Sequence, residues 1–315
     1  MPATSLLIHP EELDKTWLDQ LGALRVGALG LHPVGGKRAD ETLAAMLDRF
    51  ETPEYRALLE DAESRGIEVT CEMHALRYLL PEDALAAHPA WQRVNMAGQR
   101  TPDFNLCPSC GEALDFLSER AAALYARLPG RPRRAALWLD DSRDAFCHCE
   151  KCRGISPSDQ QMIVLHALLR GIRSVQADAR LAYLAYFETL PAPTRRDLKD
   201  GLYLEFAPYQ RDLTRPLEDA ACEANRRETA PLPALLDFFG TEDATALDYW
   251  FDNSLLSRYT KPPRKLEPHP DVVRADMAFY RRLGFQRVES FACYLGADYR
   301  ALYGLPDLTS FRADE

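Results

Sequence analysis

The chain has 315 residues, of which 46% are apolar and 27% charged, and its formal net charge is −10. This composition is typical of a globular protein that buries a large core, and the negative charge argues against a nucleic-acid partner, which requires clustered positive charge. No apolar stretch approaches the roughly 20 residues that span a bilayer, so no membrane partner is expected. The first residues show neither a basic leader nor a long apolar run, which predicts a cytoplasmic protein. The sequence makes no prediction of the oligomeric state.

Short apolar runs rich in β-formers alternate with longer amphipathic segments, a pattern typical of βα units around a parallel sheet. Eight strands are predicted, at residues 5–9, 24–32, 67–74, 135–141, 181–188, 202–209, 246–252 and 287–295. Helices are predicted between them, at residues 10–22, 39–50, 53–66, 112–130, 158–178 and 271–284.

Eight such strands predict an α/β fold in which residues 1–315 form a single (β/α)8 barrel domain. Two connections depart from the regular pattern. Residues 189–201, between the fifth and sixth strands, are too few for a full helix. Residues 75–112, after the third strand, form a long loop, and long loops are uncommon unless they are functional.

Functional residues of such barrels lie at the carboxyl ends of the strands. In this sequence those positions hold carboxylates, histidines and aromatic residues. Aromatic faces stack on sugar rings and carboxylates accept hydrogen bonds from hydroxyl groups, so the pattern favours a polyhydroxylated ligand. The rim residues are His9, His32, Glu72, His74, Asp140, Asp141, Glu188, Tyr209, Arg211, Tyr249, Trp250, Asp252, Cys293 and Tyr294.

The fourth predicted strand ends in two carboxylates, Asp140 and Asp141. Glycoside hydrolysis uses two carboxyl groups that lie about 5–5.5 Å apart for retention of configuration and about 6.5–9.5 Å apart for inversion. Neighbouring residues of a strand point to opposite faces, so a partner from another strand is more plausible than the adjacent aspartate. Asp252 would lie across the barrel mouth, and Glu188 and Glu205 are further candidates. Alternatively, one aspartate caps the following turn.

Glu72 and His74 are two residues apart on the third strand, and therefore share one face. They could bind substrate hydroxyls, or form a structural hydrogen bond with each other. A catalytic metal would need a third ligand, and none is evident nearby in the sequence.

Five cysteines form two groups, Cys107-x2-Cys110 and Cys147-x-Cys149-x2-Cys152. Two Cys-x2-Cys pairs are typical of zinc sites, and four thiolates around one ion leave no open position for chemistry. Four of these five cysteines are therefore predicted to bind a structural zinc that joins the loop after strand three to the loop after strand four. The alternative is a set of reduced thiols. No Gly-x-Gly pattern follows a strand, so no organic cofactor is expected.

Several segments resemble a known family of barrel proteins. They are EMHALRYLLPEDALAAHPAW, NLCPS, LWLDDSRDAFCHCEKCR, APYQRDLTRPLEDAACEAN and DYWFDNS, in this order. The sequence resembles domain of unknown function 4838, which includes the endo-β-N-acetylglucosaminidases of glycoside hydrolase family 163, from about residue 60 to residue 300. Two positions depart from the family pattern: Ala90 stands where the family has Glu, and Trp250 replaces a tyrosine.

The resemblance implies a glycosidase-like barrel that acts on glycans, including those that contain N-acetylhexosamine. It places Glu72, His74, Asp141, Arg211 and Tyr249 at the site. Its cysteine set maps to Cys107, Cys147, Cys149 and Cys152, with Cys110 as an addition of this sequence.

These observations predict a glycoside hydrolase with a carbohydrate substrate. Asp141 is the expected general acid, and Asp252 the nucleophile or base. If a substrate acetamido group attacks instead, Asp140 or Asp252 would orient it. Trp138, Tyr249 and Trp250 are the expected sugar contacts.

Two alternatives remain. One is a non-catalytic barrel that binds a carbohydrate. The other is a metal-dependent sugar isomerase or lyase, for which the available ligands are His9, His32, Glu72 and His74.

Overall fold

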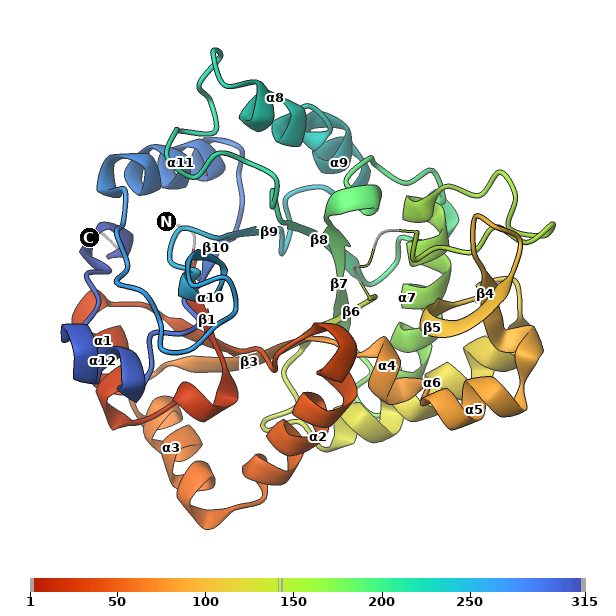
Figure 1. Ribbon diagram of the computed structural model, residues 1–315, viewed down its shortest axis with the longest axis horizontal. Helices are drawn as coiled ribbons and strands as arrows, with labels where there is room; N and C mark the ends of the chain where they lie inside the picture. Colours follow the sequence, from red (N-terminus) through yellow and green to blue (C-terminus); the bar gives the residue numbers. More distant parts are fainter. Residues whose placement is uncertain (1–2, 141, 143, 313–315) are drawn as a thin grey trace.

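Eight parallel strands close into a barrel in the computed structural model, which describes residues 3–140, 142 and 144–312 (Figure 1). Neighbours in the barrel are consecutive along the chain, and the last strand pairs with the first to close it. The structure therefore confirms the predicted (β/α)8 barrel. The strands are β1 (Ala3–Ile8), β2 (Ala28–Leu31), β3 (Glu68–His74), β6 (Arg134–Trp138), β7 (Arg180–Ala185), β8 (Leu202–Phe206), β9 (Thr245–Asp248) and β10 (Arg287–Phe291).

Helices surround the barrel and cover the outer face of its strands (Figure 1). The predicted helices correspond to α1 (Lys15–Leu24), α2 (Ala39–Phe50), α3 (Pro53–Ser64), α6 (Gly111–Ala126), α7 (Pro157–Arg173) and α11 (Pro270–Arg282). Four further helices were not predicted from the sequence: α8 (Glu223–Thr229), α9 (Leu232–Phe239), α10 (Asn253–Leu256) and α12 (Ala297–Tyr303). No helix in the described part of the chain is both long and apolar enough to cross a bilayer.

Local capping explains where the first helix begins and ends. Residues Pro10–Glu12 form a 3-10 turn, and α1 starts only after Asp14, whose side chain accepts a hydrogen bond from the Trp17 N–H at 3.0 Å. At the other end Arg25 adopts a left-handed conformation, with φ of 56°, and ends the helix. Residues 24–25, predicted as the start of the second strand, therefore belong to this helix and its cap.

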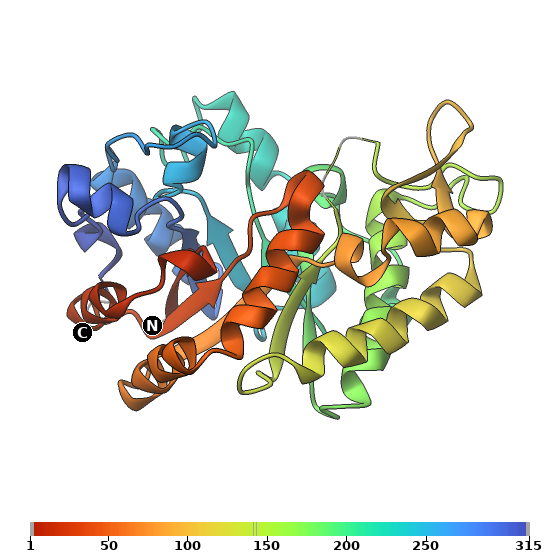
Figure 2. The same cartoon turned by 60° about the horizontal axis from the view of Figure 1, so that its bottom comes forward.

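The long loop after β3 carries structure of its own. It contains the short helices α4 (Leu76–Leu79) and α5 (Glu82–Ala87) and an antiparallel hairpin of β4 (Gln92–Val94) and β5 (Arg100–Leu106). Figure 2 shows this hairpin beside the barrel rather than within it. The connection between β7 and β8 contains only two 3-10 turns, as the short predicted linker required.

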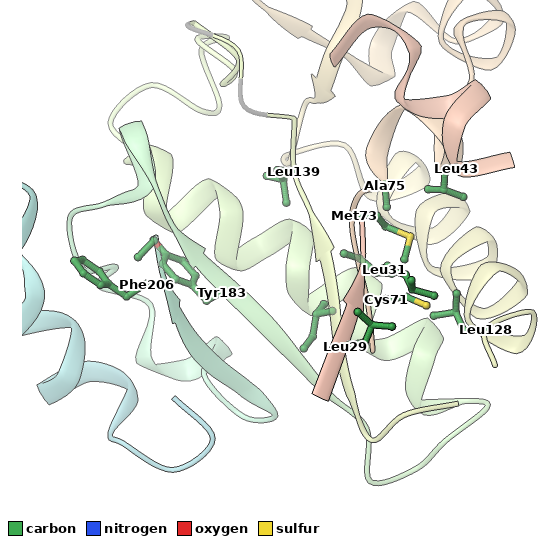
Figure 3. Packing of buried hydrophobic residues seen from close by; sticks show 14 of the residues in the cluster. Leu29, Leu31, Leu43, Cys71, Met73, Ala75, Leu128, Leu139, Tyr183 and Phe206 are labelled. Carbon is green, nitrogen blue, oxygen red and sulfur yellow. The ribbon is translucent and has the colours of Figure 1, made fainter. Parts of the chain in front are cut away.

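Two apolar layers follow from the alternation of side chains along each strand. Outward-facing residues such as Leu29, Leu31, Cys71 and Met73 pack between the strands and the helices (Figure 3). Inward-facing residues fill the barrel toward its carboxyl end, among them Leu7, Trp138, Ala182, Leu184, Leu247 and Phe291.

Helices α6 and α7 approach closely at Gly171. A Cβ built there would lie 1.9 Å from the carbonyl oxygen of Ser118, so only glycine permits this contact. The two loops that bring the cysteines together lead into the first residues of these helices.

Candidate active site

A cavity of about 460 Å³ opens where the carboxyl ends of the strands meet. Its described lining is rich in aromatic rings and contains three histidines. The barrel scaffold therefore places these side chains where functional residues of this fold lie. The lining residues are His9, His32, Val34, Gly35, Gly36, His74, Trp138, Leu184, Tyr186, Tyr209, Leu247, Tyr249, Asp252, Ser254, Tyr259, Phe291, Cys293 and Tyr294.

The three histidines follow β1, β2 and β3 and form one row. Each ring places Nδ1 against a backbone carbonyl oxygen near the next strand: His9 against His32 at 2.8 Å, His32 against Glu72 at 2.8 Å, and His74 against Leu139 at 2.7 Å. Because a carbonyl oxygen can only accept a hydrogen bond, each Nδ1 must carry the proton. We call His9, His32 and His74 the histidine row.

Burial, with the charges of His9 and His74, lowers the pKa of His32 well below its usual value. His32 is therefore uncharged at neutral pH. Its ring lies between Trp138, at a centroid distance of 5.4 Å, and Phe291, at 5.1 Å, which fixes the ring in place.

Aromatic rings form the facing wall of the cavity. Tyr249 stacks on Phe291 with a centroid distance of 5.2 Å and an interplanar angle of 17°, and Tyr209 meets Tyr249 edge-on at 5.2 Å. Tyr186 extends this wall, 5.4 Å from Tyr209. Such flat, partly exposed faces suit the apolar faces of sugar rings.

Trp138 forms part of the floor of the cavity. It is 2% exposed, and its indole Nε1–H donates to Oε2 of Glu205 at 3.2 Å. Its ring lies 5.3 Å from that of His74. Of the predicted sugar contacts, Trp138 and Tyr249 therefore line the cavity, as does His74.

Asp252 contributes the one carboxyl group among the described lining residues. Its Oδ1 caps α10 and accepts from the Ser254 N–H at 3.0 Å, the Ser254 hydroxyl at 2.5 Å and the Leu255 N–H at 3.3 Å. Burial raises the pKa of Asp252 above its usual value, although these hydrogen bonds act in the opposite direction. The carboxyl group is thus held in place through one oxygen at the edge of the cavity.

The other predicted carboxylates lie elsewhere or outside the described part. Asp141 falls outside the described residues. Asp140 and the exposed Glu188 line a small neighbouring hollow rather than the main cavity. Asn105 fixes the backbone at this point, since its side chain accepts from the Asp140 N–H at 2.8 Å and donates to the carbonyl oxygens of Asp140 and Ala145.

Glu72 lies one layer below the cavity, inside the barrel. It shares the inward face of β3 with His74, as predicted, but two residues of strand separate them by about 6.6 Å along the barrel. Glu72 lines a small internal space with Glu205, Glu289, Arg134 and Arg287. The predicted contact of Glu72 with substrate is therefore not part of the described cavity.

The three buried glutamates all have raised pKa values. Burial, with the charges of Glu289 and Glu205, raises the pKa of Glu72 well above its usual value. Burial, with the charge of Glu289, raises the pKa of Glu205 to about 8, and burial raises that of Glu289 as well. Protons are therefore retained inside the barrel at neutral pH.

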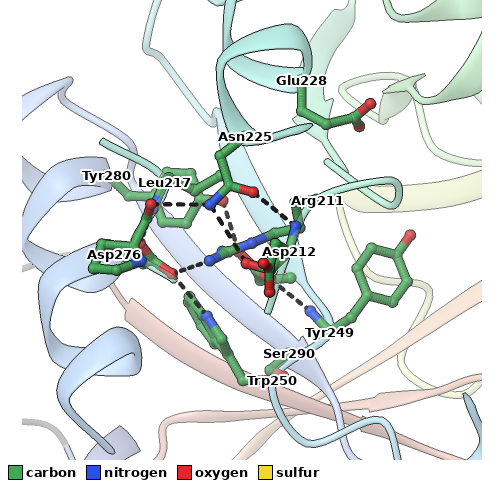
Figure 4. Close-up of polar contacts among 12 residues, drawn as sticks. Arg211, Asp212, Leu217, Asn225, Glu228, Tyr249, Trp250, Asp276, Tyr280 and Ser290 are labelled. Carbon is green, nitrogen blue, oxygen red and sulfur yellow. Dashed lines mark hydrogen bonds and ion pairs between the residues drawn. The ribbon is translucent and has the colours of Figure 1, made fainter. Parts of the chain in front are cut away.

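Arg211 and Trp250 support the cavity from behind instead of lining it (Figure 4). Arg211 pairs with Asp248 and with Asp276, each at 2.7 Å. Trp250 donates its Nε1–H to Asp276 at 3.0 Å, on α11. Tyr249 and Trp250 are adjacent and project in opposite directions, so only Tyr249 reaches the cavity.

Four cysteines lie close enough together to bind a metal ion. The sulfur atoms of Cys107, Cys147, Cys149 and Cys152 all lie within 4.8 Å of one another. The Cys107 sulfur is 3.7 Å from that of Cys149 and 3.8 Å from that of Cys152. Cys110 packs against this group but is not one of the four. We call the four residues the cysteine cluster; it joins the end of the hairpin after β3 to the loop after β6.

No second metal site appears in the described part of the chain. The cysteine cluster is the only described group of three or more His, Cys, Asp or Glu side chains whose ligand atoms come this close. The ligands considered for a metal-dependent isomerase are separated, because the ring centroids of His9 and His32 and of His32 and His74 lie 6.0 and 6.1 Å apart and Glu72 lies below them.

Several residues that shape the site were not predicted from the sequence. His9 and His32 were placed at the rim but considered only as metal ligands. Asn105 and Tyr186 were not considered. The signal for the histidines was present, since each follows an apolar strand directly. Asn105 could have been noticed because it lies two residues before Cys107, one of the clustered cysteines.

Comparisons with known proteins show similarity of fold. No protein-family model matches the sequence, so the resemblance to domain of unknown function 4838 is not shown, and no curated protein matches it. Among solved structures, a β-galactosidase from the psychrophilic Marinomonas ef1 is 12% identical with a TM-score of 0.57, and the match covers 91% of this chain and 53% of that one. A polyextremophilic β-galactosidase from the Antarctic haloarchaeon Halorubrum lacusprofundi is 10% identical with a TM-score of 0.60, covering 98% and 56%.

An O-GlcNAc hydrolase from Thermobaculum terrenum is 13% identical with a TM-score of 0.52, and the match covers 98% of this chain and 58% of that one. The chain thus spans little more than half the length of these enzymes. At such low identity the similarity concerns the fold alone. The chain is a (β/α)8 barrel similar in structure to glycoside hydrolase barrels.

Proposed function

We propose that the protein is a glycoside hydrolase that cleaves a glycosidic bond of a glycan or oligosaccharide in the cavity at the carboxyl end of its barrel. The observation that carries this proposal is the combination of an aromatic wall with the carboxyl group of Asp252 in one cavity. The aromatic faces suit sugar rings, and a carboxyl group is the catalytic unit that glycoside hydrolysis requires. The similarity of fold to β-galactosidases and to an O-GlcNAc hydrolase supports the choice of reaction class.

In this proposal two carboxyl groups have separate catalytic roles. Asp141 follows β6 in the sequence, three residues after its end, and acts as the general acid, which protonates the leaving-group oxygen. Asp252 is the nucleophile or base; it is held through Oδ1, and its other oxygen accepts no hydrogen bond from a described residue. A raised pKa moves Asp252 toward the range in which a carboxyl group exchanges protons near neutral pH.

The test is turnover of aryl glycosides by wild type, Asp141→Asn and Asp252→Asn. The panel includes β-galactosides and N-acetyl-β-glucosaminides, because the similar enzymes act on such sugars by name. Wild type is expected to hydrolyse at least one of them, and each variant to lose at least about 100-fold in kcat. The same residual rate for wild type and both variants would contradict the proposal.

A non-catalytic carbohydrate-binding barrel is the second candidate. It is favoured by one observation: the described lining contains a single carboxyl group, whereas hydrolysis by two carboxylates needs a second one within about 10 Å. Sugar binding without turnover on the whole panel would support this candidate.

We further propose that the cysteine cluster binds zinc. A tetrahedral site with Zn–S bonds of about 2.3 Å separates its sulfurs by about 3.8 Å. The sulfur separations of 3.7 and 3.8 Å from Cys107 fit this geometry. Four thiolates would close the coordination sphere, so the ion would stabilise the loops and take no part in the reaction.

A further inference from the structure

The histidine row has a chemical property that bears on which sugars the cavity accepts. His9 and His32 both turn Nδ1–H toward a backbone carbonyl, each at 2.8 Å. The two nitrogens lie on different edges of the imidazole, so Nε2 is turned away from that carbonyl, and both rings line the cavity. No described residue donates a hydrogen bond to Nε2 of His9 or His32. A neutral ring in this tautomer offers Nε2 only as an acceptor.

The protonation state of His32 fixes this role. Burial, with the neighbouring charges of His9 and His74, lowers the pKa of His32 well below its usual value. At neutral pH its Nε2 can therefore accept a hydroxyl hydrogen but cannot donate to a carboxylate or a phosphate.

The charge of the cavity also favours an uncharged ligand. The described lining contains no lysine and no arginine, and Asp252 is its one acidic side chain. Lys261 lies near the rim, over the ring of Tyr294 at 4.1 Å, but Asp298 pairs with its ammonium group at 2.6 Å. An anionic sugar that entered this cavity would meet the acceptor nitrogen of His32 and the carboxyl group of Asp252, and no lysine or arginine of the described lining.

We propose that His32 determines specificity by accepting a hydrogen bond from a hydroxyl group of an uncharged sugar residue, so that the cavity excludes uronic acids and sugar phosphates. The inference rests on the proposed carbohydrate site, but it concerns which sugar binds and not whether the bond is cleaved.

The experiment compares matched pairs that differ in one group. Binding of p-nitrophenyl β-galactoside and β-galacturonide, and of the corresponding glucoside and glucuronide, is measured by calorimetry with the full chain at pH 7. The neutral member of at least one pair is expected to bind at least about tenfold more tightly, because the uronate would bury a charge in a cavity whose described lining contains no lysine or arginine.

Variants then connect this selectivity to the histidine. His32→Leu removes the acceptor and is expected to weaken binding of the neutral sugar by about tenfold or more. His32→Gln keeps an acceptor oxygen and is expected to retain most of the binding. His166→Gln is the matched control, because His166 is an exposed histidine on α7, away from the cavity. Near-ultraviolet circular dichroism checks that each variant is folded.

The outcomes separate this inference from the proposed function. Neutral sugars that bind selectively but are not cleaved would support the inference and contradict the hydrolase. Uronides that bind as tightly as the neutral sugars, or no binding of any neutral sugar, would overturn the inference. Hydrolysis of the uronides would overturn it as well, while leaving the hydrolase in place. If His32→Leu misfolds, the ratio of neutral-sugar affinity to uronide affinity measured for wild type still tests the inference.

Discussion

Arg211 and Asp248 form an ion pair of 2.7 Å in which both side chains are fully buried. Asp248 is the last residue of β9; it also accepts from the Tyr280 hydroxyl at 2.8 Å and from the Tyr249 N–H at 2.8 Å. Arg211 therefore joins the loop after β8 to the strand end that presents Tyr249 to the cavity (Figure 4). It stabilises the site from behind.

Replacing Arg211 by Met is expected to lower the free energy of unfolding by about 3–5 kcal/mol. The reason is that Asp248 and Asp276 would remain buried without their shared cation. Urea denaturation measures the loss. Arg274→Met, which breaks the exposed pair with Asp271 on the same helix α11, serves as the control and is expected to cost less than about 1 kcal/mol. Equal losses in the two variants would show that the buried pair has no special role.

The glutamates inside the barrel make stability depend on pH. Glu205 has a pKa of about 8 in the folded protein against an ordinary value of 4.5, so the folded state binds this proton more tightly than the unfolded state. Its stabilising contribution is fully present below about pH 4.5 and is lost as the pH rises through about 8. The charged groups around it are Glu72, Glu289, Arg134 and Arg287.

Glu205→Gln removes this titration while keeping an oxygen that can accept from the Trp138 Nε1–H. Relative to wild type, the variant is expected to be more stable at pH 9 than at pH 5, by a difference on the order of 1–3 kcal/mol. Urea denaturation at several pH values provides the measurement, with Glu60→Gln on the exposed face of α3 as control. Parallel pH profiles for wild type and Glu205→Gln would contradict the expectation.

The barrel itself was predictable from the sequence because strand periodicity and helix caps are local signals. All eight barrel strands fall within the predicted ranges or within two residues of them. The difference at the start of β2 arises because Arg25 ends α1 in a left-handed conformation, which the apolar pattern of residues 24–32 did not indicate. The hairpin after β3 was not predicted, since β4 has only three residues and both of its strands carry polar residues.

The site was less predictable because sequence spacing gives the face of a strand but not the depth in the barrel. Glu72 and His74 share a face, yet only His74 reaches the cavity. Neighbouring Tyr249 and Trp250 could not be separated without knowing which of them turns inward. The carboxylates inside the barrel were also unexpected, since such interiors are usually filled by branched apolar side chains.

Tyr249 and Trp250 provide a paired test of which side chain contacts the ligand and which one supports the cavity. Tyr249→Ala removes part of the aromatic wall and is expected to weaken binding of a neutral glycoside by about tenfold. Trp250→Ala removes a buried side chain and the partner of Asp276, and is expected to lower the free energy of unfolding by about 3–5 kcal/mol. Calorimetric titration and urea denaturation of both variants give the comparison. A loss of affinity in folded Trp250→Ala equal to that in Tyr249→Ala would place both residues at the ligand.

The cysteine cluster can be tested with a control from its own surroundings. Purified wild type is expected to contain about one equivalent of zinc, measured by mass spectrometry of the metal. Cys149→Ser removes one of the four ligands, so metal content should fall and stability should drop by at least about 2 kcal/mol, because metal binding contributes to the folding free energy. Activity should fall indirectly, since this loop begins after β6, the strand that Asp141 follows in the sequence.

Cys110→Ser is the matched control for that experiment. Cys110 packs beside the cluster and caps α6, but its sulfur is not among the four that lie within 4.8 Å of one another. The variant is therefore expected to keep its metal and its stability. If Cys110→Ser loses the ion while Cys149→Ser keeps it, the ligand set is different from the cluster in the structure. If neither variant changes metal content or stability, the cluster does not stabilise the loops through a metal ion.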